Sequence, residues 1–254
     1  MTPGARWRIG ATLVGWTVRE ALQRPLLIVA LFAMALFTVA LPSLLAFEFG
    51  QAQRMARELG YANLRLTALF VAILLGPATV GRDREEGMLL TLLVRPLGPA
   101  AWLLGRFLGG CLIMALVLLV LSATMALALE GAAGPAGPVL RLAAMATVLL
   151  AVAVGLASAL PPALAAIGTV AVFGLGHVHG YVRAVLASAG PSAAGAFAAV
   201  VPDLEAIGLP LWSSHAPVGL AQAFGRAALA AAGYLAIAVA IAQLRETPAT
   251  GDRA

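Results

Sequence analysis

The sequence predicts an all-α membrane protein with six transmembrane helices, an N-terminal interfacial helix, a short cytoplasmic helix and a re-entrant segment before the last helix. Of its 254 residues, 62% are hydrophobic and only 11% are charged, whereas a soluble domain is about 45–50% apolar. Several stretches also run for the ~20 residues that a helix needs to cross a bilayer without meeting a charge. This composition excludes both a soluble globule and a disordered chain.

Residues 1–25 are predicted to form an amphipathic helix that lies in the membrane interface. Its apolar residues recur at helical spacing, and its charged residues lie mostly elsewhere around the helix. The apolar positions are Trp7, Ala11, Val14, Val18 and Ala21, and the charged ones include Arg8, Arg19, Glu20 and Arg24. The alternative is a solvated basic tail. We do not expect a cleaved signal peptide, because the apolar run that follows is too long and no small-residue cleavage site comes after it.

One transmembrane domain is expected over residues 26–244, followed by a cytoplasmic tail at 245–254. The spans are predicted at 26–47, 63–81, 107–129, 142–160, 162–182 and 227–244. The fourth and fifth spans are joined at Pro161-Pro162 with almost no loop, so they should be antiparallel neighbours.

Residues 184–202 are apolar as well, but Gly190-Pro191 breaks the stretch near its middle. We interpret it as two half-helices that dip into the outer leaflet and return; the alternative is a seventh span. With six spans, ten arginines lie inside and six outside, as the positive-inside rule favours. With seven spans the balance falls to nine against seven. Six spans therefore fit better, with both termini in the cytoplasm.

Several functions are excluded by residues that the chain lacks. All sixteen basic residues are arginine, so the chain has no phosphate-loop lysine, and any ATP hydrolysis must come from a partner. Cys111 is the single cysteine, which leaves no internal disulfide or multi-thiolate metal site. The arginines are distributed between apolar segments, so the positive charge indicates topology and not nucleic-acid binding.

The most informative polar segment follows the second span. Asp83, Glu85 and Glu86 precede an apolar run that ends at Pro96. Acidic residues favour a helix N-terminus, and a proline disfavours helical conformation in the residue before it. The segment should form a short cytoplasmic helix, with Leu89, Leu92 and Leu93 against the bundle and its charged turn open to a soluble partner. An ordinary solvated loop is the alternative.

This segment resembles the signature of type-2 ABC transporter permeases. The matching residues are Asp83-Arg84-Glu85-Glu86-Gly87, Leu92-Leu93, Arg95-Pro96-Leu97 and Leu104-Gly105-Arg106-Phe107-Leu108-Gly109. The order of interfacial helix, six spans and irregular segment agrees as well, and Val201-Pro202-Asp203-Leu204 resembles an element common before the last helix of that family. The chain departs from the family pattern at Met88, where threonine is usual, and at Gly98-Pro99, which replaces a frequent Ser-Arg pair.

The resemblance implies an exporter subunit of the cell (inner or plasma) membrane, with no catalytic residue and no cofactor or metal of its own. It would form a dimer with a second copy or a paralogue. This dimer would work with two cytoplasmic ATP-binding subunits, which hold the ATP and Mg. The dimer interface is expected along the first and fifth spans. The expected coupling residues are Arg82, Asp83, Arg84, Glu85, Glu86, Gly87, Leu89, Leu92, Leu93 and Pro96, and the interfacial helix with Arg8, Arg19, Glu20 and Arg24 would also touch the ATPase. The alternative is a non-transporting scaffold or assembly factor of a respiratory or other membrane complex.

Polar residues on the outer side offer weaker candidates. Pro191, Pro202, Asp203 and Glu205 follow or interrupt the broken segment and form a possible outer gate, with a solvated loop as the alternative. The imidazoles of His177 and His179 point about 200° apart on a helix, so we interpret them as a polar helix end and not as a metal pair. Trp102 and Trp212 precede spans and are expected as interface anchors.

Overall fold

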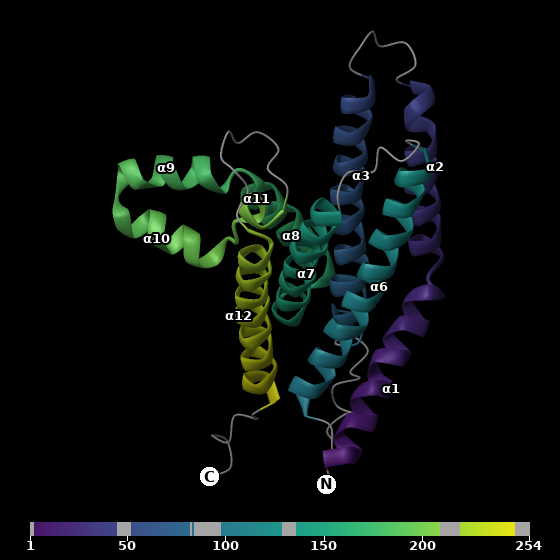
Figure 1. Cartoon of the computed structure of the whole chain (residues 1–254). Coiled ribbons are helices and arrows are strands. Elements are labelled where there is room, and N and C mark those ends of the chain that lie inside the picture. The colour runs from purple at the N-terminus through teal and green to yellow at the C-terminus, as the bar shows by residue number, and fades with distance from the viewer. Residues whose placement is uncertain are drawn as a thin grey trace, which may run out of the picture.

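In the computed structural model the protein is a bundle of helices from which one helical hairpin projects (Figure 1). The structure describes residues 3–44, 52–81, 83, 98–128, 136–208 and 219–246, and this part of the chain contains helices and no strands. The long helices are α1 (Pro3–Leu22), α2 (Pro25–Leu44), α3 (Ala52–Leu75), α6 (Pro99–Ala128), α7 (Ala136–Ala159), α8 (Pro162–His177) and α12 (Leu220–Glu246). The shorter ones are the π-helix η1 (Gly76–Gly81), α9 (His179–Ala189), α10 (Pro191–Val200) and α11 (Leu204–Ile207).

Four of these helices are long and apolar enough to cross a membrane, and there are up to six spans if each of two bent helix pairs counts as one. By helix length and hydropathy the chain is therefore a multi-pass membrane protein. The first residues of α1 and the last of α12 lie at the same end of the bundle (Figure 1).

Helix α7 forms the centre of the bundle. In its most apolar window 72% of the residues are buried, against 28% for α12. Small side chains on α12 recur every four or seven residues, that is every one or two helical turns, and are buried against the bundle: Ala223, Ala227, Ala231, Ala238 and Ala242. Such a seam allows the backbones of two helices to approach closely, which compensates for the weak hydrophobic drive between helices in lipid.

Helix α3 is held on both sides by specific contacts. The buried Asn63 amide donates to the Met34 carbonyl at 3.1 Å and to the Thr38 hydroxyl at 2.8 Å, which joins α3 to α2. At its other end α3 widens into η1, where Pro77 removes a backbone donor and its ring disfavours regular α-helix. A Cβ on Gly76 would lie 2.6 Å from the Ala153 Cβ, so only glycine allows this approach to α7.

Most helices extend beyond the predicted spans. Helix α3 begins at Ala52, α6 at Pro99 and α12 at Leu220, which is 11, 8 and 7 residues before the spans predicted to begin at 63, 107 and 227. The prediction counted charge-free residues only, whereas a helix continues through Arg106 or Arg226 when the side chain has a partner or reaches water.

The predicted fifth span, 162–182, covers two helices that meet at a sharp bend. Helix α8 ends at His177, and α9 leaves it at an angle of 81°. Residues 184–202 do form two helices broken at Gly190, as predicted, but the first of them already begins at His179. Together α9 and α10 make the hairpin that projects to the left in Figure 1; its entry into a leaflet stays a prediction.

Trp102 is not the interface anchor that was expected. Its side chain is 3% exposed and belongs to the apolar core. The sequence signal, a tryptophan just before a predicted span, failed because α6 begins three residues before Trp102 and carries it into the bundle.

Candidate functional site

The candidate site lies where α1 meets the first turns of α6, near the end of η1. Two glycines of α6 make the contact possible. A Cβ on Gly105 would lie 2.9 Å from the Leu13 Cβ, and one on Gly109 would lie 2.6 Å from the Thr17 Cβ. Real Cβ atoms essentially never approach to such distances, so the Gly-x-x-x-Gly spacing lets α1 lie directly on the α6 backbone.

Arg106, between these glycines, is the centre of a charge cluster. Its side chain is 2% exposed, and it binds two carboxylates from distant parts of the chain. Its Nε and Nη2 donate to Asp83 Oδ2 at 3.0 and 2.5 Å, and its Nη1 donates to Glu20 Oε2 at 2.5 Å. The guanidinium also lies over the Trp16 ring, 4.3 Å from the ring centroid. One arginine therefore fastens α1, α6 and Asp83 together.

Glu20 extends the cluster to the end of α1. Its Oε1 accepts a hydrogen bond from Arg24 Nη2 at 2.7 Å, one helical turn away. Burial raises the pKa of the Glu20 carboxyl. The hydrogen bonds and positive charges of Arg106 and Arg24 together lower it by more than burial raises it, so the pKa of Glu20 lies below its usual value. Glu20 is thus held in its charged form. We call Trp16, Glu20, Arg24, Asp83 and Arg106 the inner charge cluster.

The inner charge cluster balances two carboxylates with two guanidinium groups. Buried charges are tolerated when they are paired and hydrogen-bonded, and removing one partner leaves the other uncompensated. In this cluster the carboxylates accept hydrogen bonds from the guanidinium groups, and the Trp16 ring stacks on the Arg106 guanidinium. Such an arrangement positions and joins segments; it offers no nucleophile–base pair for chemistry.

The inner charge cluster brings together three residues that the sequence had assigned to two separate segments. Glu20 and Arg24 were predicted on the interfacial helix and Asp83 on the coupling segment. Arg8 and Arg19 lie on α1, and Arg19 is exposed. The other expected coupling residues lie outside the described residues: Arg82, Arg84, Glu85, Glu86, Gly87, Leu89, Leu92, Leu93 and Pro96.

Arg106 and Trp16 are the residues that sequence reasoning missed. Arg106 was counted among the arginines that indicate topology, and no contact was predicted for Trp16. The available signal was one arginine between two glycines four residues apart, at the start of a long charge-free run. A charge in that position needs a carboxylate partner, and Asp83 and Glu20 were both candidates.

On the opposite side of the bundle, the expected gate residues have local structural roles. Asp203 Oδ1 accepts a hydrogen bond from the Ala206 backbone N–H at 2.9 Å and caps α11, while its Oδ2 lies 3.6 Å from Nδ1 of the buried His179. Pro191 is the first residue of α10. Glu205 lies in α11 and is half-buried, and Pro202 precedes α11. These contacts fix the bend between α9 and α11; opening at this place stays a prediction.

The two histidines do not converge. His177 Nδ1 lies 2.8 Å from the Phe173 carbonyl oxygen, within its own helix, whereas His179 stacks on Phe197 of α10. Within the described ranges no group of three or more His, Cys, Asp and Glu side chains could hold a metal ion.

Comparison of the chain with protein-family models and with curated proteins gave no match. What the structure establishes is therefore a helical multi-pass membrane protein with a buried charge cluster at one end of its bundle.

Proposed function

We propose that the chain is the membrane subunit of an ATP-binding cassette exporter, driven by a separate cytoplasmic ATPase and acting as a dimer. The observation that carries this proposal is the double ion pair of Arg106 with Glu20 and Asp83. Both segments that the resemblance assigns to the ATPase interface are thereby fastened to the base of one long helix.

The mechanical consequence supports the proposal. Asp83 lies near the start of the acidic segment, which would contact the ATPase and move with it. Glu20 belongs to the interfacial helix, which would contact the ATPase beside that segment. Because Arg106 joins both to α6, a displacement at either place moves the third span. Rigid elements with packed contacts transmit small shifts in this way.

The dimer would use the surface of α8 that the chain leaves open. Leu164, Ile167 and Val170 are exposed at helical spacing, and Ala163, Ala171 and Gly174 on the same helix are exposed small residues. Small residues favour helix association in membranes. This face agrees with the fifth span expected from the family, and a second copy or a paralogue would cover it.

Purification of the tagged chain in mild detergent, followed by mass spectrometry, tests the assignment. An ATP-binding subunit should accompany it in near-equal amount, and ATP hydrolysis by the complex should depend on the phosphate-loop lysine of that partner. Replacing Glu85 and Glu86 by arginine should abolish recovery of the partner without loss of membrane insertion. Glu58→Arg is the control, because it reverses one carboxylate charge toward the far end of α3.

Two results would contradict the proposal. If the partner is recovered equally with both variants, the acidic segment is not the interface. If no ATP-binding subunit is recovered while subunits of a respiratory or other membrane complex are, the chain is a scaffold or assembly factor.

A further inference from the structure

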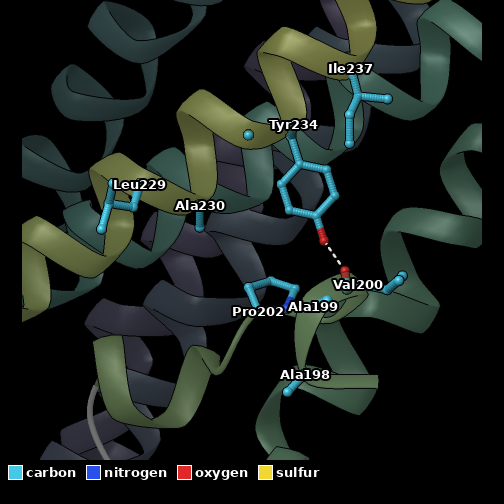
Figure 2. Close-up of a pocket in the computed structure, with 9 residues that line it drawn as sticks. Ala198, Ala199, Val200, Pro202, Leu229, Ala230, Tyr234 and Ile237 are labelled. Atoms are coloured by element: carbon cyan, nitrogen blue, oxygen red, sulfur yellow. Dashed lines mark hydrogen bonds between the residues drawn. The ribbon is translucent and has the colours of Figure 1, made fainter. Parts of the chain in front are cut away.

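A groove lies between the end of the hairpin and the last helix (Figure 2). It has a volume of about 320 Å³, which is within the range of small-ligand sites. Leu229, Ala230, Gly233 and Ile237 of α12 form one wall, and residues 198–200 with Pro202 form the other. Among the described residues that line it, none is charged. The lining therefore suits a hydrocarbon chain.

Tyr234 closes the back of this groove. Its hydroxyl donates a hydrogen bond to the Val200 carbonyl at the end of α10 (Figure 2). A carbonyl in the last turn of a helix has no partner within that helix, so this bond satisfies both groups. With its hydroxyl donor already in use, Tyr234 presents mainly the aromatic ring to a ligand.

A positively charged side chain, that of Arg226, lies at one end of the same face of α12. Arg226 precedes Leu229, Ala230, Gly233 and Ile237 by 3, 4, 7 and 11 residues, which places its Cα on the side of α12 that forms the wall. Its side chain is exposed. At a rise of about 1.5 Å per residue, Arg226 lies about 10 Å along the axis from Gly233.

We infer that this groove binds an anionic phospholipid, with an acyl chain between α10 and α12 and the headgroup phosphate at Arg226. The apolar wall matches the tail, the arginine matches the head, and the distance between them spans several methylene groups. The charge at one end favours a lipid over the apolar helix of a second copy. The inference requires only that α12 crosses the membrane, so it does not depend on the proposed function.

The test uses the full chain in lipid nanodiscs with a phosphatidylglycerol that carries a photoactivatable diazirine in mid-chain. After illumination, mass spectrometry should find the label on α12 between Leu229 and Ile237 and on residues 198–200. Gly233→Phe should remove most of this label, because a Cβ at Gly233 meets nothing within 4 Å and the ring fills the groove without a clash. Gly225→Phe is the control, since Gly225 is equally open but lies about 80° away from Gly233 around α12.

The headgroup is tested separately with Arg226→Gln. One arginine near an anionic surface contributes about 1 kcal/mol, so labelling by phosphatidylglycerol should fall about fivefold. Labelling by the matching phosphatidylcholine probe should be weak and unchanged. Arg183→Gln, on the exposed part of α9, should leave both unchanged.

Three outcomes would overturn the inference. The first is equal labelling of wild type and Gly233→Phe. The second is equal labelling by the two lipids. The third is rapid disulfide formation between copies that carry Ile237→Cys in a Cys111→Ala background, which would assign the groove to a protein–protein contact.

Discussion

At the scale of single residues, Arg106 determines how much the inner charge cluster contributes. Arg106→Met leaves Asp83 buried, at 6% side-chain exposure, without the guanidinium that compensates it. Breaking a buried pair on one side costs about 3–5 kcal/mol. We expect a marked fall in the thermal unfolding temperature of the detergent-solubilised protein. Glu20→Gln should cost no more than about 1 kcal/mol, because the Glu20 side chain is 24% exposed and partly solvated.

A double variant separates this electrostatic explanation from lost packing. Arg106→Met combined with Asp83→Asn leaves neither charge buried, so it should be more stable than Arg106→Met alone. If the loss of stability in the double variant equals the sum of the losses in the two single variants, Asp83 is not the partner that makes Arg106 necessary.

Part of the site was predictable at this scale. Glu20, Arg24 and Asp83 were identified from their positions in an interfacial helix and an acidic segment. Their convergence was not, because Glu20 and Arg106 are 86 positions apart and periodicity within one helix carries no information on which helices become neighbours. The prediction that Trp102 is an interface anchor failed for the same reason, because tertiary packing determines the surroundings of its side chain.

At the scale of elements, the contact of α1 with α6 depends on the absence of side chains at Gly105 and Gly109. Gly109→Val would place carbon atoms against the Thr17 Cβ, and overpacking of this kind costs about 1–3 kcal/mol. Detachment of α1 should raise tryptic cleavage after Arg19 and Arg24 by about tenfold. Gly225→Val has the same change in helix propensity but open space around it, and should leave cleavage unchanged.

If Gly109→Val left cleavage after Arg19 unchanged, α1 would be held by the lipid interface and not by α6. That result would also separate α1 from α6, and the proposed coupling route through Arg106 would lose its first step.

The hairpin of α9 and α10 shows which helix ends can be predicted from the sequence and which cannot. Gly190-Pro191 ends one helix and starts the next, because proline suits a first turn and not a helix interior. The bend after His177 has no proline, and it depends on a long-range contact: Gly176 lies against Leu204, where a Cβ would approach the Leu204 Cγ to 2.6 Å. Such a requirement is visible only in the folded structure.

At the scale of the whole molecule, the fold class followed from composition and run length because the bilayer admits few solutions. A chain with about 20-residue apolar runs must satisfy its backbone within helices. The arrangement of those helices was beyond the sequence: α7 is central because small residues on α12 and at Gly76 let α12 and η1 approach it closely. Their order in the chain does not encode this.

The number of crossings is the remaining property of the whole molecule, and it can be measured with two cysteines. In a Cys111→Ala background, Glu58→Cys and Gln243→Cys are both exposed positions, on α3 and near the end of α12. With six crossings an impermeant maleimide should label Glu58→Cys from outside intact cells and Gln243→Cys only after the membrane is opened. Labelling of both from outside would mean that α9 and α10 cross the bilayer, which would make seven crossings and place the end of α12 on the side opposite to the N-terminus.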